Sequence, residues 1–155
     1  MNQQNVMQTL QQAVRLHQSG QVAVANELYL LVLSIAPKNT DALRLSGVAS
    51  MQLGELDQAI ATLEKARSLS PESPEVLNSL GLAYKNAGDV EKAKAMYEDA
   101  LRSQPNHADT LTNLGNLLLS VGQALGAVGI FERVVAAHPK KLVGHLQLGN
   151  AYLDA

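Results

Sequence analysis

Residues 71–105 read PESPEVLNSLGLAYKNAGDVEKAKAMYEDALRSQP, and this stretch begins and ends with proline. The 34-residue step from Pro71 to Pro105 recurs along the chain in four series: Pro37, Pro71, Pro105 and Pro139; Gly20, Gly54, Gly88 and Gly122; Gly47, Gly81, Gly115 and Gly149; Ala25, Ala59, Ala93 and Ala127. A fixed period of this length is the signature of a repeat array. The stretch is therefore one copy of a unit that the chain repeats.

The quoted repeat reads as two helices. Apolar residues spaced by three and four place one apolar face on the first helix: Val76, Leu77, Leu80, Leu82 and Tyr84. Ser73 can cap this helix and Pro74 fits its first turn. Ala87 and Gly88 end it, Asp89 starts a second helix, and Pro105 stops the chain before the next repeat. The pattern predicts an antiparallel helix pair with a short turn.

The register divides the chain 1–155 as a single array of repeats at 6–39, 40–73, 74–107 and 108–141, with a half repeat at 142–155 that holds a first helix only. About nine helices are therefore expected, paired antiparallel. The first repeat carries Thr9, Gln12 and Ala13 where larger apolar residues and glycine are usual, which suits an N-terminal cap. The second repeat has Ser46 and Ser50 at usually larger positions.

Small and bulky residues recur at fixed places for packing reasons. Gly81 lies inside a helix, where glycine costs about 1 kcal/mol against alanine, so we expect a second helix to approach it closely. Ala93 is the expected small partner on that helix. Gly88 suits a turn with a left-handed backbone. One position of the second helix is expected to form a plug between neighbouring repeats: Tyr29, Leu63, Tyr97 and Phe131.

Composition and charge exclude several function classes. Twelve basic and fourteen acidic residues give a net charge of −2, and no repeat forms a basic stripe, so nucleic acid is an unexpected partner. The chain has no cysteine, and no stretch approaches the ~18 apolar residues of a membrane span. The N-terminal stretch that begins at Met1 shows no signal-peptide pattern. We expect a soluble, cytoplasmic protein that does not bind membranes.

No catalytic, metal or cofactor site is predicted. The four histidines lie in different repeats without metal-ligand spacing: His17, His107, His138 and His145. A surface loop position is expected for His107. Gly126 and Gly129 fall within a helix pattern and lack the ending of a phosphate-binding loop. We expect no enzyme activity from this chain and no cofactor.

The repeat resembles the tetratricopeptide repeat. In the third repeat the resemblance is carried by Leu77, Leu80, Gly81, Tyr84, Gly88, Ala93, Tyr97, Ala100 and Pro105, and in the fourth by Leu111, Leu114, Gly115, Leu118, Gly122, Ala127, Phe131, Val134 and Pro139. It covers essentially the whole chain. The resemblance implies an all-α fold, a right-handed α-α superhelix or solenoid, with first helices lining a concave groove that holds partner segments.

The position of each residue within its repeat then predicts which side chains face the groove. The expected peptide-binding residues are Arg44, Val48, Met51, Asn78, Ser79, Leu82, Lys85, Asn86, Thr112, Asn113, Asn116, Leu119, Gln147 and Asn150. Their side-chain amides can pair with the backbone of an extended peptide, or they can be solvated surface. Such an asparagine run resembles the repeat domains of O-linked N-acetylglucosamine transferases.

An apolar stripe follows the same face: Val14, Val48, Met51, Leu82, Leu119 and Leu153. It either marks an interaction site or is covered by tight winding or by oligomer contacts.

A carboxylate clamp for chaperone C-terminal tails is not expected. In the two possible frames the clamp places read Arg44, Val48, Ser79, Asp109 and Asn113, or Asn78, Leu82, Asn113, Val143 and Gln147. Neither frame has a cation on its last helix.

Three functions stay open from the sequence. The leading hypothesis is an interaction module that binds a peptide or protein segment in the groove. A second is a substrate-recruiting N-terminal region of a larger transferase, since the start of the chain resembles repeat regions of bacterial glycosyltransferase, sulfotransferase or methyltransferase fusions. A third is self-association through the uncovered helix at 142–155. We favour the chain being a fragment of a longer protein.

Overall fold

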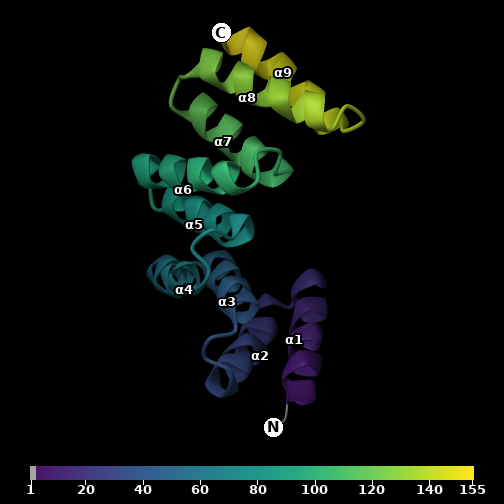
Figure 1. The fold of residues 1–155 in the computed structure, drawn as a ribbon, viewed down its shortest axis with the longest axis vertical. Helices are drawn as coiled ribbons and strands as arrows, with labels where there is room; N and C mark the ends of the chain where they lie inside the picture. The colour runs from purple at the N-terminus through teal and green to yellow at the C-terminus, as the bar shows by residue number, and fades with distance from the viewer. Residues whose placement is uncertain (1–2) are drawn as a thin grey trace. The chain divides into compact units, whose positions relative to one another are not determined.

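The computed structural model describes residues 3–155, and within them it contains nine α-helices and no strand. Met1 and Asn2, part of the stretch inspected for a signal peptide, lie outside the described residues. Figure 1 shows the helices in chain order: α1 (Gln3–Gln18), α2 (Val22–Ile35), α3 (Thr40–Gln52), α4 (Leu56–Leu69), α5 (Pro74–Asn86), α6 (Val90–Ser103), α7 (Ala108–Ser120), α8 (Ala124–Ala137) and α9 (Leu142–Asp154). The predicted all-α class and the helix pairs are confirmed.

The chain forms two compact units that meet in sequence at Pro71 and Glu72. In the N-terminal unit α1 packs on α2, α2 on α3, and α3 on α4. In the C-terminal unit α5 packs on α6, α6 on α7, α7 on α8, and α8 on α9. The first helices of the C-terminal unit also contact one another, α5 with α7 and α7 with α9. The division falls close to the boundary between the second and third repeats, and a single array stays a prediction.

Helix ends follow the sequence signals. The Ser73 hydroxyl accepts from the Val76 backbone N–H at 3.4 Å, and Pro74 stands at the first helical position of α5. The Asp89 carboxylate accepts from the Lys92 N–H at 3.1 Å at the start of α6. The glycine that ends each of the four turns has φ between +74° and +84°, a region that a Cβ disfavours. These caps and turns were predicted, and they are confirmed.

One cap was missed because histidine is an uncommon capping residue. His107 is the N-cap of α7: its Nδ1 accepts from the Thr110 N–H at 3.3 Å and lies 2.7 Å from the Thr110 hydroxyl. His107 lies in the loop before α7, as expected, and the structure adds the capping role. The signal was its place, two residues after Pro105, where Ser73 stands relative to Pro71.

The glycines inside first helices make room for bulky side chains. A Cβ built on Gly81 would lie 2.6 Å from the Tyr97 ring, and one on Gly115 would lie 2.5 Å from the Phe131 ring. The nearest partner is thus the plug of the same repeat, and in the second repeat the backbone oxygen of Ala59, the equivalent of Ala93, also lies 3.3 Å from a Cβ built on Gly47. The ring stacks on bare helix backbone, which no residue with a Cβ would allow without movement.

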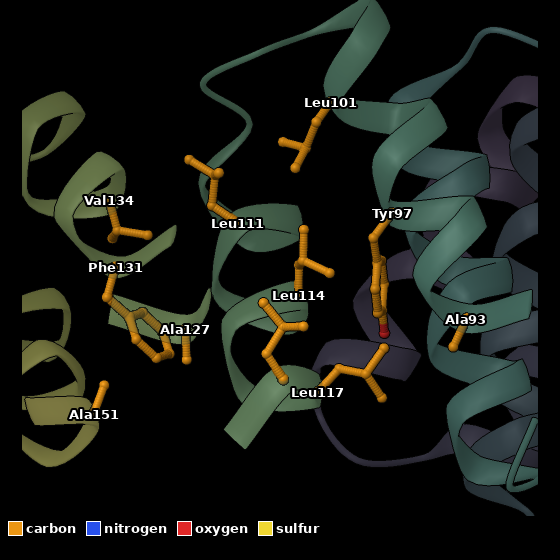
Figure 2. Packing of buried hydrophobic residues seen from close by; sticks show 11 residues of the cluster. Ala93, Tyr97, Leu101, Leu111, Leu114, Leu117, Ala127, Phe131, Val134 and Ala151 are labelled. Atoms are coloured by element: carbon orange, nitrogen blue, oxygen red, sulfur yellow. The ribbon is translucent and has the colours of Figure 1, made fainter. Parts of the chain in front are cut away.

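Tyr97 and Phe131 lie on opposite sides of α7 in the C-terminal unit. Figure 2 shows Tyr97 beside Leu114 and Leu117, and Phe131 beside Ala127. All five side chains are buried. The Tyr97 hydroxyl has no hydrogen-bond partner, so the ring alone stabilises this position.

The N-terminal unit packs around Tyr29 with different chemistry. Ala13 occupies the place of the helix glycine and is fully buried with Tyr29. Ser46 and Asn26 are buried together, and the Ser46 hydroxyl donates to Asn26 Oδ1 at 2.8 Å. The unusual Ser46 of the second repeat therefore has a polar partner on α2, at a position that the later repeats fill with leucine.

Candidate functional site

The predicted groove residues lie on first helices, α3 in the N-terminal unit and α5, α7 and α9 in the C-terminal unit. Most are half-buried, which is typical of side chains lining a helical surface. Asn86 and Asn150 are exposed. Ser79 is only 7% exposed, and its hydroxyl donates to the Glu75 carbonyl at 2.8 Å. The expectation of Ser79 as an exposed groove residue was therefore wrong, because it turns back on its own helix.

Four of the predicted amides pair with one another across neighbouring first helices. Asn113 Nδ2 donates to Asn78 Oδ1 at 3.0 Å, which joins α7 to α5. Gln147 Nε2 donates to Asn116 Oδ1 at 3.2 Å, which joins α9 to α7. The amide run is thus two ordered pairs rather than four independent side chains.

Each pair leaves unused hydrogen-bonding groups in a fixed order. Because an amide has two donors and one carbonyl, Asn78 and Asn116 keep their amino groups, while Asn113 and Gln147 keep carbonyl oxygens that make no bond in the pair. Gln147 Oε1 is buried and has no partner. A buried acceptor without a partner costs about 1–3 kcal/mol. This oxygen is closed off from partners outside the fold, so it lowers the stability of the second pair and offers no binding group.

The apolar stripe is partly used by the fold itself. Leu82 is half-buried, and Leu119 packs against the core of the C-terminal unit. Val48 and Met51 are half-buried on α3. Only Leu153, at 86% exposed, stands clear of its surroundings. Leu82 and Leu119 lie on α5 and α7, the helices that carry the first amide pair, as do the half-buried Lys85 and Thr112.

His17 organises the corresponding face of the N-terminal unit. Its Nδ1 lies 3.2 Å from the Tyr29 hydroxyl and its Nε2 lies 3.0 Å from Gln52 Oε1. A neutral imidazole with its proton on Nε2 satisfies both contacts, donating to Gln52 and accepting from Tyr29. Burial raises the pKa of the Tyr29 hydroxyl, and the nearby Arg44 guanidinium opposes that rise. The sequence pattern did not predict these partners, because Gln52 is 35 residues away on another helix.

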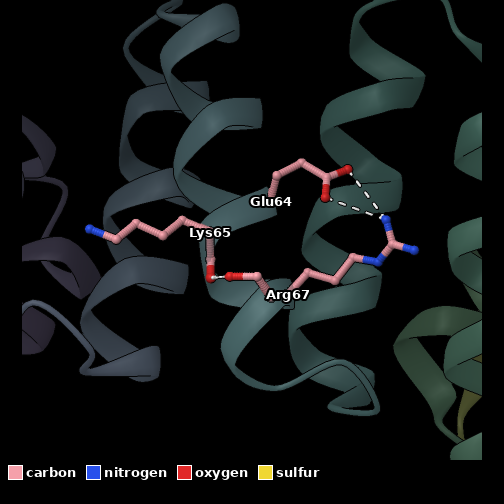
Figure 3. Close-up of polar contacts among 4 residues, drawn as sticks. Glu64, Lys65 and Arg67 are labelled. Atoms are coloured by element: carbon pink, nitrogen blue, oxygen red, sulfur yellow. Dashed lines mark hydrogen bonds and ion pairs between the residues drawn. The ribbon is translucent and has the colours of Figure 1, made fainter.

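The remaining titratable groups make local surface contacts. Arg67 pairs with Glu64 at 3.4 Å, while Lys65 points away from them (Figure 3). A hydrogen bond with Lys92 lowers the pKa of the Asp89 carboxyl. The Tyr152 hydroxyl donates to Glu132 at 2.8 Å, and that bond raises the pKa of Tyr152. Across residues 3–155, no group of three or more His, Asp or Glu side chains is placed to hold a metal ion.

In the part of the chain that the structure describes, no helix combines the length and the apolar character required to cross a bilayer.

Solved structures share this fold. The crystal structure of MamA protein matches with a TM-score of 0.78 and 23% identity, over 96% of this chain and 81% of that one. A Pseudomonas aeruginosa pilF structure has a TM-score of 0.87 and 20% identity, over 96% and 68% of the two chains. The APC/C hetero-tetramer Cut9-Hcn1 matches with a TM-score of 0.85 and 18% identity, over 94% and 29%. No curated protein was found to match.

Family models match the repeats directly. A model described as TPR repeat matches residues 47–88, and one described as tetratricopeptide repeat matches residues 78–141. The two matches overlap and run together through the second, third and fourth repeats. With the helix pairs, the turn glycines and the all-α superhelical repeat fold of the similar structures, they show that this chain belongs to the tetratricopeptide repeat family.

Proposed function

We propose that this chain is a protein-interaction module whose C-terminal unit binds an extended peptide segment along α5, α7 and α9. The observation that carries the proposal is the pair of amide bridges, Asn78 with Asn113 and Asn116 with Gln147. They hold amino groups and carbonyl oxygens in a fixed sequence across three helices. A peptide backbone offers donors and acceptors that complement such a sequence.

Recognition of this kind favours the main chain of the partner over its side chains. Amide groups on the protein read the N–H and C=O groups that every residue carries, so affinity depends weakly on partner sequence. The half-buried Leu82 and Leu119 supply apolar contacts beside the amides. Leu119 also packs into the core, which fixes its position before any partner arrives and reduces the ordering cost of binding.

The structural neighbours support an interaction role at a coarser level. Cut9-Hcn1 is a hetero-tetramer, so a chain with this fold assembles with another protein there. For this chain we extend that role to peptide segments on the strength of the amide bridges alone.

A peptide selected from a random phage-displayed library against the whole chain provides the probe. We expect the Asn113→Ala, Asn116→Ala double variant to weaken its binding about tenfold or more, since about two hydrogen bonds are lost. Gln123→Ala is the control, because Gln123 is exposed and makes no capping bond. Because the double variant also loses two hydrogen bonds between helices, it should melt at a lower temperature, and binding is measured well below that melt. Equal binding by the double variant and the control would show that the amides are only solvated surface.

A second candidate function is self-association through α9, favoured by one specific observation. Leu146 and Leu153 are 63% and 86% exposed, and a Cβ on Gly149 would meet no atom within 4 Å. In α7 the matching Gly115 is covered by Phe131. We propose that a second copy covers this face. Sedimentation velocity should show a dimer that Leu146→Asp dissociates and that Leu125→Asp, on the equally exposed α8 residue, leaves intact. A monomer at high micromolar concentration contradicts it.

A further inference from the structure

His107 caps the helix that takes part in both amide bridges. Its Nδ1 accepts from the Thr110 N–H at 3.3 Å and lies 2.7 Å from the Thr110 hydroxyl. Helix α7 carries Asn113 and Asn116, one partner of each bridge. In a regular α-helix the Asn113 N–H bonds to the carbonyl four residues earlier, which is that of Asp109 in the first turn. The order of that first turn therefore helps to fix the position of Asn113.

The capping bond needs an unprotonated Nδ1. A neutral imidazole has one acceptor nitrogen, whereas an imidazolium has two donors and no acceptor. The protonated ring can still donate to the Thr110 hydroxyl, but that bond leaves the Thr110 N–H without an acceptor. Because Thr110 is fully buried, water does not replace the lost acceptor. The imidazolium also brings positive charge to the positive end of α7. Protonation of His107 therefore removes the cap.

The caps of the other first helices do not titrate in the same range. Asn39 Oδ1 accepts from the Ala42 N–H at the start of α3, and the Ser73 hydroxyl accepts from the Val76 N–H at the start of α5. Amides and hydroxyls keep these acceptors at every pH near neutrality. Lys141, before α9, makes no side-chain capping bond. Of α3, α5, α7 and α9, only α7 therefore has a cap that changes between about pH 5 and about pH 8.

The helices packed against α7 carry charged groups near its capped end. Arg133 of α8 donates to the Pro105 carbonyl at 2.7 Å, two residues before His107. Glu75 of α5 accepts from the Ser73 hydroxyl at 2.9 Å. The other charged or titratable groups are Asp99 and Arg102, which pair on α6, Asp109 in the first turn of α7, and His138, Lys140, Lys141 and His145 between the end of α8 and the middle of α9. Of these neighbours, only the two histidines change charge between about pH 5 and about pH 8.

We propose that the His107 cap makes peptide binding by the amide bridges sensitive to acid. Near neutral pH the unprotonated imidazole holds the first turn of α7, and protonation at lower pH releases that turn. Asn113 then loses its fixed position beside Asn78, and binding must restore the order of the helix at a cost in affinity. The inference rests on the proposed function of the amide bridges and adds its regulation by pH.

The test measures binding of a phage-selected peptide without histidine, blocked at both ends, to the whole chain at about pH 7.5 and about pH 5.5. We expect the wild type to bind about fivefold more weakly at the lower pH, the factor typical of losing one helix cap. His107→Asn should bind equally at both, because Asn39 shows that asparagine caps a first helix of this chain. His107→Ala should bind weakly at both. His145→Gln is the matched control and should keep the wild-type pH dependence, since the bond from His145 Nε2 to the Pro139 carbonyl survives protonation.

Hydrogen exchange of the Thr110 amide measures the cap without any peptide. After correction for the intrinsic exchange rate, its protection should fall about fivefold between about pH 7.5 and about pH 5.5 in the wild type and stay level in His107→Asn. Equal wild-type affinity at the two pH values, unchanged protection, or an acid loss of binding that His107→Asn retains overturns the inference. The proposed function fails in a different way, as a peptide that ignores the Asn113→Ala, Asn116→Ala variant at the higher pH while the Thr110 amide still loses protection in acid.

Discussion

The two compact units build the same helix pairs with different interactions. In the C-terminal unit, rings stack on bare glycine backbone, and the buried Tyr97 hydroxyl has no partner. In the first repeat of the N-terminal unit, Ala13 replaces the glycine, and the Tyr29 hydroxyl is held by His17; in the second repeat of that unit, Leu63 packs on Gly47. The repeat therefore specifies where a bulky side chain must go, and it leaves open whether close packing or hydrogen bonds hold it.

The same contrast extends to the surfaces. The C-terminal unit presents two amide bridges, whereas the N-terminal unit presents Arg15 and Arg44 near Leu10, Val14 and Leu45.

The largest predicted effect is expected from a substitution that disturbs the close packing of the C-terminal unit. Gly115→Ala places a Cβ 2.5 Å from the Phe131 ring, and we expect a loss of about 2 kcal/mol in unfolding free energy, since overpacking outweighs the gain in helix propensity. Gly149→Ala is the control: it meets open space and should stabilise by up to about 1 kcal/mol. Urea denaturation measures both. A neutral Gly115→Ala would refute the packing account.

The next effect concerns the polar pair of the N-terminal unit. Asn26→Ala should cost about 1.5 kcal/mol, because it leaves the buried Ser46 hydroxyl without its acceptor on α2. The Asn26→Ala, Ser46→Ala double variant should lose less unfolding free energy than the sum of the losses in the two single variants. A double-mutant cycle from urea unfolding gives the coupling energy. Strict additivity would mean that the bond contributes nothing.

The two plug tyrosines should respond to phenylalanine with opposite signs. Tyr97→Phe removes a hydroxyl without a partner and should stabilise the fold by about 1 kcal/mol. Tyr29→Phe removes the partner of His17 and should destabilise it by about 0.5–1 kcal/mol. Thermal and urea unfolding of both variants measure the sign of each change in unfolding free energy. Changes of the same sign would erase this distinction between the units.

Alkaline pH gives a smaller test of the same residue. Burial raises the pKa of the Tyr97 hydroxyl, so the folded chain keeps a proton that the unfolded chain releases near its ordinary pKa of about 10. The protonated Tyr97 hydroxyl therefore adds to the unfolding free energy below the unfolded-state pKa of about 10, and this contribution is lost as the pH rises from that value through the folded-state pKa. Unfolding free energy should fall less steeply between about pH 8 and about pH 11 in Tyr97→Phe than in the wild type. Identical slopes would contradict it.

Periodicity predicted the helices and their boundaries because proline, turn glycines and capping residues act locally. Ser73 and Asp89 needed only neighbouring backbone to serve as caps. The sequence did not predict that the Tyr97 ring would lie against Gly81, because helix rotation decides which side chain of the second helix faces a glycine. That rotation depends on packing between helices, which a local pattern does not encode.

The sequence predicted which face carries the amide side chains, but it did not predict which amides bond to one another. Register placed Asn113 and Asn116 on one face, but their bonds to Asn78 and Gln147 depend on the spacing between first helices. Arg44 was predicted at the groove, but its nearness to Arg15 was not, because the two arginines belong to different helices and share no motif. The likeness to transferase fusions stays a prediction.

The most direct test of the account measures how a phage-selected peptide is read by the C-terminal unit. Calorimetry would compare an alanine scan of the peptide with a scan that methylates its backbone nitrogens one at a time. We predict that at least one N-methylation weakens binding about tenfold, that most alanine changes have little effect, and that Asn113→Ala, Asn116→Ala removes the N-methyl sensitivity. Binding that survives every N-methylation and collapses with alanine changes would contradict backbone recognition by the amide bridges.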